Sequence, residues 1–481
     1  MAKKLVYDIH DKPKFGNLLI FALQQVLAIL AATIAVPTII GLPTQIPAAI
    51  LGAGIGTLVY QLFTKFKSPV FLGSSFAFLS SLFVALAYGY CGILLGSVVA
   101  GLVYVVIALI IKLVGTKWVD KLMPPVIIGP TVTIIGLSLA GSAMGDIVKA
   151  NADAVNGGYN LIGLLCGLIT FLTVVICSTQ KKYTMPKLIP FILGILAGYV
   201  AASVFTAIGL VANIEYLQII NWDPVVNNFV DADGAFKGVQ AFFSLPNISL
   251  VAAIKELVNG TLTSDILAAN PGAKLIDMGG AVEVIVAFLP VALVVFAEHI
   301  ADHKNLSSII DRDLIKDPGL SNTLLGDGVG SIMGTAFGIC PNTTYGESVG
   351  CVAITGNASV ITITVTAFMC IILSFISPLM ALLQTIPSCV MGGVCLTLYG
   401  FIAVSGLKMF KDLDLNDNKN LFVVSSILIA GIGGLSIQIP YALAENGAVA
   451  KTIQVTSIAT ALILGIITNA VLSKFDKKEE K

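Results

Sequence analysis

The stretch CPNTTYGESVGCVAITG, residues 340–356, lies among long apolar segments but cannot form an ordinary membrane-spanning helix. Pro341 has no backbone N–H to donate, and the run at 342–344 favours extended or capping conformations. Gly346 permits a sharp change of direction. From Glu347 onward the residues are small and apolar. The pattern predicts a short extended segment that leads into a half-helix beginning near Glu347.

A half-helix inside a membrane has chemical consequences at its N-terminus. The first turn presents unpaired backbone N–H groups and the positive end of the helix dipole. Such broken helices are tolerated only where they line a cavity or are buried in protein. Glu347 is therefore a candidate binding residue. The alternative is that its carboxylate only caps the helix and contacts no ligand.

The composition is that of a membrane protein. The 481 residues are 57% hydrophobic and 11% charged, whereas soluble proteins carry roughly 25% charged residues. The zero net charge gives no indication of a nucleic-acid partner, and the eight cysteines lack metal-binding spacing. The sequence contains no nucleotide-binding motif. We expect a polytopic protein that contacts membrane lipid, needs no cofactor and is not an enzyme.

Fourteen apolar segments are predicted to cross the membrane, at about 20 residues per span. They are 17–41, 45–64, 68–87, 89–114, 122–144, 158–178, 187–212, 281–303, 319–338, 340–356, 358–382, 386–409, 417–440 and 448–473. Most lysines lie in the tails 1–16 and 474–481 and in the loops after even-numbered spans, whereas the long loop 213–280 lies on the other side. By the positive-inside rule, both termini are predicted to be cytoplasmic and this loop external.

Three pairs of similar stretches indicate an internal repeat. PVFLGSSFAF from residue 69 resembles PNTTYGESVG from residue 341, and the pairs at 24–25 and 298–299 and at 124–129 and 387–392 have nearly the same separation. Each half would contain seven spans, so the two halves would be inverted relative to one another. Inverted repeats with paired interrupted spans are typical of secondary transporters with a site near the membrane midplane.

Ionisable residues within the predicted spans are rare and therefore informative. Glu298 and His299 lie late in the eighth span, and Asp302 follows Glu298 by one helical turn on the same face. Glu298 and Glu347, from different spans, could hold a neutral hydrogen-bonding ligand, and protonation would remove the cost of a buried charge. The alternatives are a structural ion pair at Glu298 and an ordinary polar helix end at Asp302 and His303.

Four longer stretches resemble the nucleobase–ascorbate transporter (nucleobase:cation symporter-2) family, most closely its bacterial uracil-permease branch. They are LPVALVVFAEHIADH (289–303), DPGLSNTLLGDGVGSIMGTAFG (317–338), PNTTYGESVG (341–350) and PSCVMGGVCLTLYGFIAVSG (387–406). PVFLGSSFAF (69–78) fits the same branch.

The resemblance implies an all-α fold of fourteen spans in two inverted seven-span repeats, with short β-strands in the third and tenth spans. Residues 17–114 and 281–382 would form a core domain, and residues 122–212 and 386–473 a gate domain. A homodimer through the gate domain would be compatible with this arrangement.

The resemblance also implies a substrate site between the short strands of the third and tenth spans. Glu298 would hydrogen-bond the edge of a nucleobase, and Glu347 would bind its other side. The backbone around Tyr345 and Gly346 would assist, and Phe76 would contribute a main-chain contact.

Two positions depart from the pattern of the uracil branch. Ser348, which would also adjoin the substrate, replaces a usual Asn and lacks the paired donor and acceptor of an amide. Asp302 stands where the uracil branch tends to have His, and in this it is similar to the purine and ascorbate branches. With Glu298 and Glu347, Asp302 would carry proton coupling.

Together these features predict an inner-membrane, proton-coupled uracil symporter that works by alternating access, with sodium left open as a coupling ion. One alternative is a xanthine or purine permease of the same fold. An anion transporter of similar architecture would be expected to have a cationic or neutral site in place of Glu298 and Glu347. A membrane enzyme or receptor could instead use these two residues as an acid–base pair.

Overall fold

The computed structural model describes residues 5–149, 159–182, 186–187, 189–231, 233–443 and 449–479. Its principal helices are α1 (Phe15–Ile39), α2 (Ile46–Phe63), α3 (Leu79–Leu86), α4 (Gly89–Val114), α5 (Lys117–Leu122), α6 (Pro125–Ser138), α7 (Ala140–Ile147), α8 (Leu161–Thr179), α10 (Pro190–Ala212), α11 (Asp223–Phe229), α12 (Ser249–Asn259), α13 (Ser264–Ala269), α14 (Met278–Ile310), α15 (Leu320–Phe337), α16 (Gly346–Thr355), α17 (Val360–Ser374), α18 (Ser377–Gln384), α19 (Ser388–Lys408), α20 (Asn418–Ile432) and α21 (Ser457–Glu479).

Within these ranges, nine helical segments are long and apolar enough to cross a membrane. They are α1, α2 with its preceding turn, α4, α6 with α7, α8, α10, α14, α19 and α21. Shorter apolar helical segments lie at Phe76–Leu86, Val360–Ser374 and Asn418–Ile432. The prediction of a mostly helical, polytopic membrane protein is confirmed, with nine candidate spans among the described residues.

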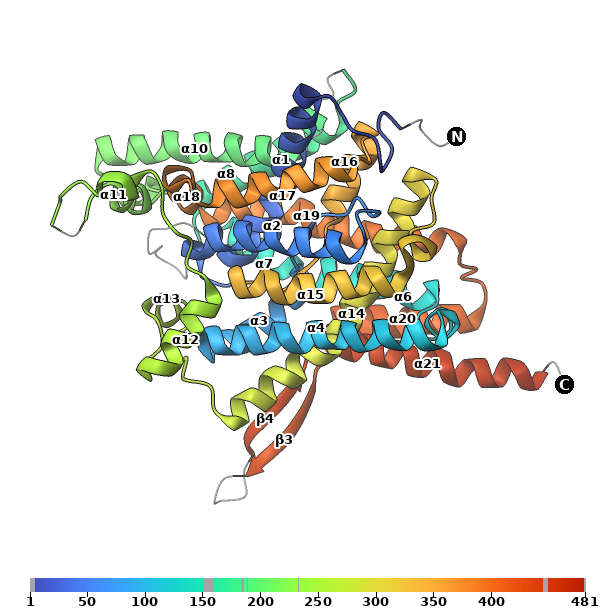
Figure 1. Ribbon diagram of the computed structural model, residues 1–481. Coiled ribbons are helices and arrows are strands. Elements are labelled where there is room, and N and C mark those ends of the chain that lie inside the picture. Colours follow the sequence, from blue (N-terminus) through green and yellow to red (C-terminus); the bar gives the residue numbers. More distant parts are fainter. Residues whose placement is uncertain are drawn as a thin grey trace.

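The long helices run side by side, roughly from left to right in Figure 1, and pack in two groups. In one group α2 and α4 pack against α15, α17 packs against α1 and α2, and α14 packs against α4. In the other, α19 packs against α6 and α8, α8 packs against α10, and α20 packs against α6 and α21. Each group combines helices from the first and the second half of the chain.

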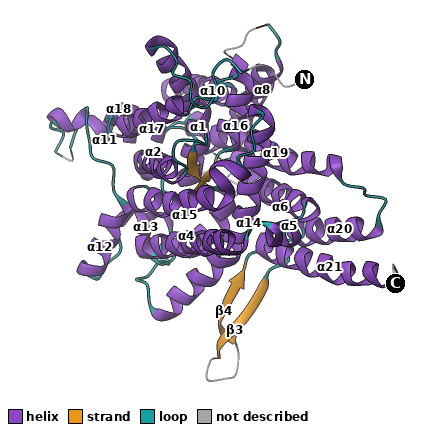
Figure 2. Ribbon diagram, turned by 45° about the vertical axis from the view of Figure 1, so that its right-hand side comes forward, coloured by secondary structure: helices purple, strands orange, loops and turns teal. Residues whose placement is uncertain are grey.

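Two short strands pair with each other near the centre of the bundle, where Figure 2 shows them in orange. Strand β1 (Leu72–Ser74) and strand β2 (Asn342–Thr344) are antiparallel, with Gly73 opposite Thr343. Each strand leads into a short helical segment, α3 after β1 and α16 after β2. The extended segments expected in the third and tenth spans are therefore present, and they pair with each other.

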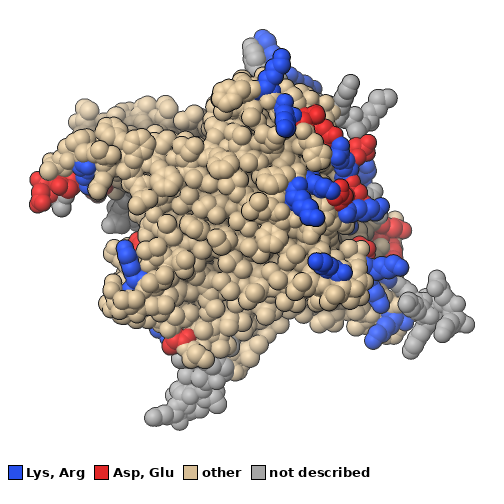
Figure 3. Space-filling view, viewed as in Figure 1, with Lys and Arg blue, Asp and Glu red and all other residues tan. Residues whose placement is uncertain are grey.

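The two ends of the bundle differ in content. The N- and C-terminal ends of the chain lie at the right of Figure 1, whereas α11, α12 and α13, from the loop 213–280, lie at the left. Between the two ends the face in Figure 3 is almost uncharged, and most Lys and Arg side chains in view gather toward the end with the termini. This distribution is typical of a protein whose middle faces lipid.

The segments predicted as tails and loop contain regular structure and contacts with the helices. Residues 1–4 and 480–481 lie outside the described residues, but Tyr7 pairs with Asn357 in a β-bridge, and α21 continues to Glu479. In the loop, the buried Glu256 of α12 accepts a hydrogen bond of 2.9 Å from the backbone N–H of Tyr90. Burial raises the pKa of the Glu256 carboxyl. The loop therefore docks onto α4.

Three span predictions are wrong in extent. Helix α14 runs from Met278 to Ile310, beyond the predicted 281–303 at both ends. The facing ends of the predicted spans 417–440 and 448–473 form a β-hairpin of strands β3 (Ile437–Leu443) and β4 (Val449–Val455). The glycines of the run GIGGL at 431–435 disfavour helix, and the following β-branched alternation favours a strand.

Candidate functional site

The site is built around the start of α16. This helix begins at Gly346, one residue before the predicted Glu347, and Glu347 lies in its first turn. The strand residues before it are buried, whereas Gly346 is exposed and Glu347 is partly exposed. The N-terminal turn of α16 therefore borders solvent-accessible space in the interior of the bundle.

Tyr345 ties the crossing strands together. Its backbone N–H donates to the carbonyl of Phe71 over 3.1 Å, and its hydroxyl donates to the carbonyl of Ser74 over 3.1 Å. The ring lies over Gly73, where an added Cβ would come within 2.3 Å of the ring carbon Cζ. Tyr345 is 3% exposed. The backbone around Tyr345 and Gly346 was predicted to assist substrate binding. The N–H of Tyr345 is already bonded to Phe71, whereas the N–H of Gly346 adjoins the accessible space.

The carboxylates of α14 face this region. Asp302 accepts a hydrogen bond of 2.6 Å from the hydroxyl of Thr344 in β2, and a Cβ on Gly346 would lie 3.9 Å from Asp302 Oδ1. Glu298 is partly exposed, and its buried Oε2 atom has no hydrogen-bond partner. A buried carboxylate oxygen without a partner is costly. Glu298 thus retains an acceptor for a ligand or a proton.

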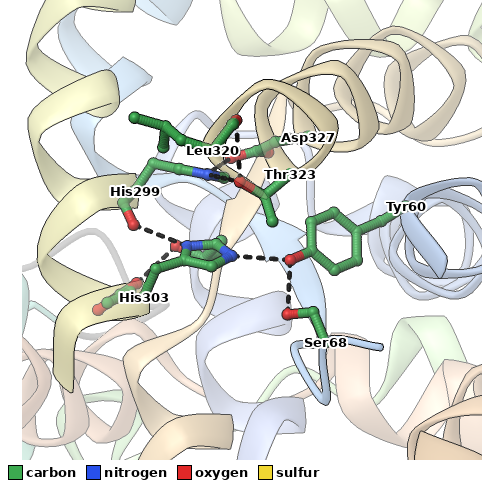
Figure 4. Close-up of polar contacts among 9 residues, drawn as sticks. Tyr60, Ser68, His299, His303, Leu320, Thr323 and Asp327 are labelled. Carbon is green, nitrogen blue, oxygen red and sulfur yellow. Dashed lines mark hydrogen bonds and ion pairs between the residues drawn. The ribbon is translucent and has the colours of Figure 1, made fainter. Parts of the chain in front are cut away.

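Two histidines form a buried polar network behind these carboxylates (Figure 4). His299 contacts Asp327 Oδ2 through Nδ1 at 2.7 Å and Thr323 Oγ1 through Nε2 at 3.0 Å. His303 contacts the carbonyl of His299 at 2.8 Å and the hydroxyl of Tyr60 at 2.8 Å. The network joins α14 to α15 and α2 and fixes the rotation of α14.

The alternative that Asp302 and His303 belong to an ordinary polar helix end is wrong. His303 is fully buried, and Asp302 is 7% exposed. Helix α14 continues for seven residues beyond His303, to Ile310, so these side chains lie well within the helix. Asp302 belongs to the group that surrounds β2 and the start of α16.

Ser348 is fully buried and contacts α1. Its hydroxyl accepts a hydrogen bond of 3.3 Å from Nε2 of Gln25, and its carbonyl lies 3.4 Å from the same atom. The Oε1 atom of Gln25 is buried without a partner. The side-chain amide beside Ser348 is thus that of Gln25 in α1, and not that of an Asn at position 348. Ser348 therefore has no exposed surface of its own, unlike the neighbouring Gly346 and Glu347.

Phe76 lies in the 3-10 turn Phe76–Phe78 after β1. Its ring packs edge-on against Tyr399 of α19, with ring centroids 5.4 Å apart. The side chain therefore spans the boundary between the two packing groups of helices. The structure brings together β1, the start of α16 and α14, and it places Phe76 at the edge of this cluster.

Three contributors to the cluster were not predicted as site residues: Gln25, Thr344 and Asp327. Asp327 had a usable signal, because it is an acidic residue within the predicted ninth span. Gln25 had appeared only as a repeat anchor. The role of Thr344 had no sequence signal, because its hydrogen bond to Asp302 depends on how β2 lies against α14.

The arrangement can bind a neutral, planar polar molecule. Glu298 and Glu347 offer acceptors, or donors when protonated, and the first turn of α16 offers backbone N–H donors. In the part of the chain that the structure describes, no group of three or more His, Cys, Asp or Glu side chains is arranged to hold a metal ion.

Comparison with known proteins gives consistent matches over nearly the whole chain. Uracil permease of Bacillus caldolyticus is 35% identical over 98% of this chain and 95% of its own length. Uracil permease of Bacillus subtilis (strain 168) is 34% identical over 100% and 97%. Uracil permease of Escherichia coli (strain K12) is 32% identical over 96% and 94%.

Among solved structures, the transmembrane domain of the cyanobacterial bicarbonate transporter BicA matches with a TM-score of 0.53 at 14% identity, covering 96% of this chain and 100% of that one. SLC26A9 matches with a TM-score of 0.58 at 12% identity, covering 96% and 66%. These two likenesses concern the fold alone. A family model described as "Permease family" matches residues 16–439, and the chain therefore belongs to this permease family, the nucleobase:cation symporter-2 family.

Proposed function

We propose that this protein is a proton-coupled uracil symporter. The observation that carries the proposal is the partly exposed Glu298, whose Oε2 atom lacks a partner, on a helix packed against the half-helix that holds Glu347. Uracil is neutral and planar, and its edge alternates N–H donors and carbonyl acceptors. The relatives named as uracil permeases support this choice of base.

In this proposal the residues have distinct roles. Glu298 accepts from an N–H group on one edge of uracil, while Glu347 and the backbone N–H of Gly346 bind the other side. Tyr345 holds β2 against β1 so that the first turn of α16 keeps its position. Phe76 closes the side toward α19, and Ser348 acts through its contact with Gln25.

The proposed transport cycle uses the two packing groups of helices. The nine long segments, the three shorter apolar ones, α15 and α16 would make the fourteen spans in two inverted repeats. The group that contains α1–α4 and α14–α17 would be the core domain, which moves against a gate domain of α6–α10 and α19–α21. Protons on Glu298, Asp302 or Glu347 would travel with the substrate. Sodium is the competing coupling ion.

The proposed location is the inner membrane, with both termini cytoplasmic and the loop 213–280 outside. The charge distribution in Figure 3 supports this orientation, since most Lys and Arg side chains in view lie toward the end with the termini. Labelling of a single cysteine introduced at the exposed Val239, in the loop, by an impermeant maleimide should occur from outside intact cells.

Uptake into proteoliposomes tests the function. Radiolabelled uracil should accumulate when the lumen is more alkaline than the outside, and a protonophore should abolish the accumulation. Accumulation driven by a sodium gradient at equal pH would overturn proton coupling. Binding of uracil without any uptake would favour the receptor alternative.

A xanthine or purine permease is the second candidate, favoured by Asp302, which resembles the purine branch. Thermal-shift measurements on purified protein with uracil, xanthine and hypoxanthine separate the two. A melting temperature raised by uracil alone supports our proposal, whereas stabilisation by xanthine and not by uracil would replace it.

A further inference from the structure

Residues 6–11, which precede α1, form a strap that lies along the segment after α16. The strap and residues 356–360 exchange parallel backbone hydrogen bonds, and these are Val6 N–H to Gly356 O at 2.7 Å, Tyr7 N–H to Gly356 O at 3.2 Å, Ala358 N–H to Tyr7 O at 2.9 Å and Val360 N–H to Ile9 O at 3.0 Å. The hydroxyl of Ser359 also donates to the carbonyl of Asp11 over 2.7 Å. Segments at the end of a domain are usually poorly ordered unless they are tied down. This strap is tied down along most of its length.

The strap binds the C-terminal end of α16. Gly356 is the C-cap of this helix and has a left-handed backbone, with a φ of 71°. A Cβ added at Gly356 would lie 3.2 Å from the backbone nitrogen of Val6. A side chain at this position would therefore oppose both the cap and the close approach of the strap. Glycine lets the backbone of the strap reach the last turn of α16.

The side chain of Ile9 extends this contact into the bundle. Ile9 is 3% exposed and belongs to a buried apolar cluster. The cluster contains Val349 and Val352 of α16, Leu306 and Ile310 of α14, and a residue of strand β1. Ile9 thus contributes to the packing between the two helices that border the site.

Polar and aromatic contacts join the strap to the ends of α14 and α1. Asp8 forms an ion pair with Arg312, just beyond the end of α14. The hydroxyl of Tyr7 accepts a hydrogen bond of 3.1 Å from Nδ2 of Asn17, and its ring packs edge-on against Phe21 with centroids 5.8 Å apart. Figure 1 shows the start of the described chain beside α16. The strap therefore connects α1, α14 and α16, which all belong to the proposed core domain.

Helix α16 depends on such contacts for its position. It has 10 residues, and a helix this short owes its stability to tertiary packing. Its first turn carries Glu347, and its C-cap Gly356 lies about 14 Å away at 1.5 Å per residue. Because the helix is rigid over this length, a shift of its last turn also moves its first turn.

We propose that residues 6–11 are a positioning segment of the binding site. The strap fixes the C-terminal end of α16 and thereby the place of Glu347 in the site. This inference rests on the function proposed above only for the identity of the ligand. As part of a polar tail outside the spans, these residues would be expected to be dispensable for binding. We assign them the opposite role: loss of the strap loosens α16 and weakens uracil binding, although no residue that contacts uracil is removed.

Hydrogen–deuterium exchange of the full chain in nanodiscs, without uracil, tests the hold on α16. Ile9→Ala should raise the exchange of the amides at 346–355 by at least about tenfold, because it deletes most of a buried side chain. Ile9→Val keeps the branched contact and should stay within about threefold of the wild type. Peptides from α19, in the other packing group, are the internal control. Unchanged exchange at 346–355 in Ile9→Ala overturns the proposal.

Uracil affinity, measured by isothermal titration, tests the consequence for the site. Ile9→Ala should weaken binding about tenfold, whereas Ile9→Val should bind within a few-fold of the wild type. Faster exchange of α16 with unchanged affinity would leave the strap a purely structural role and overturn the proposal. If the wild-type protein binds no uracil, the proposed function fails, while the exchange measurement still decides whether the strap holds α16.

A substitution at Val6 covers the case in which Ile9→Ala does not fold. Val6 is 58% exposed, so Val6→Pro removes the backbone donor to Gly356 with little loss of packing. Val6→Ala keeps this donor and is the matched control. The proline variant should exchange a few-fold faster at 346–355 than the alanine variant. Equal exchange in the two variants would refute the strap.

Discussion

The two strand-containing segments, 69–86 and 341–355, use the same backbone device with different chemistry. In both, a three-residue strand leads into a short helical segment near the centre of the bundle. The first segment presents the buried Phe76 after its strand, whereas the second presents the accessible Gly346 and Glu347. The same backbone device is therefore present in both segments, but only the second segment carries a carboxylate directly after its strand.

The helices before these segments show the same asymmetry. Gln24 and Gln25 of α1 occupy positions that the predicted repeat would pair with Glu298 and His299 of α14. The first pair is neutral, while the second is ionisable and belongs to the polar cluster around Asp302. Each additional buried charge would cost stability unless it were paired. In the function proposed above, the first half would provide position, and the second half would provide binding and proton exchange.

The largest effect is expected at Glu298. Glu298→Ala removes the carboxylate with the unpaired oxygen and should lower uracil uptake about 100-fold or more, which corresponds to roughly two charge-assisted hydrogen bonds. Its first-half counterpart, Gln24→Ala, should stay within a few-fold of the wild type. Uptake normalised to protein in the membrane provides the measurement. Equal losses in both variants would contradict the division between the halves.

The contact between strands β1 and β2 should be most sensitive to substitution at Gly73. Gly73→Ala places a Cβ 2.3 Å from the Tyr345 ring, and such overpacking costs about 1–3 kcal/mol or more. We expect a melting temperature lower by several degrees and weaker uracil binding. Gly350→Ala in α16 is the control, because nothing lies within 4 Å of its added Cβ. If both variants melt alike, the strand crossing is looser than the contacts indicate.

A smaller effect is expected at Glu347. Glu347→Gln keeps the size of the side chain but removes its exchangeable charge, so uracil binding should weaken about tenfold. The dependence of binding on pH should also become flatter. Isothermal titration at several pH values measures both quantities. An unchanged affinity and pH profile would mean that Glu347 only caps α16.

The smallest effect is expected at Ser348. Ser348→Asn adds a second amide beside Gln25 in a fully buried position, and should change the preference between uracil and xanthine by a few-fold, near 1 kcal/mol. Competition of each unlabelled base against labelled uracil measures the preference. Ser348→Ala, which removes only the hydroxyl, should change affinity without changing preference. Identical competition curves would exclude Ser348 from substrate selection.

Much of the fold follows from local patterns in the chain. Long apolar segments require helices, because a membrane offers no other partner for backbone groups. Pro341 and Gly346 bound the interruption of the tenth span, and α16 begins within one residue of the predicted position. The strands β3 and β4 were not predicted, because these segments were assigned as spans from their apolar content. The glycines and the two-residue alternation at 431–439 were the contrary signals.

By itself, the sequence determined the membrane class, the interrupted spans and the carboxylates available to them, since these depend on residue type and near neighbours. Only the tertiary structure decided which groups remain free. Thr344 engages Asp302, Gln25 engages Ser348, and Glu298 keeps an oxygen without a partner. These contacts join segments far apart in the chain. Their outcome depends on how helices pack, which no local pattern encodes.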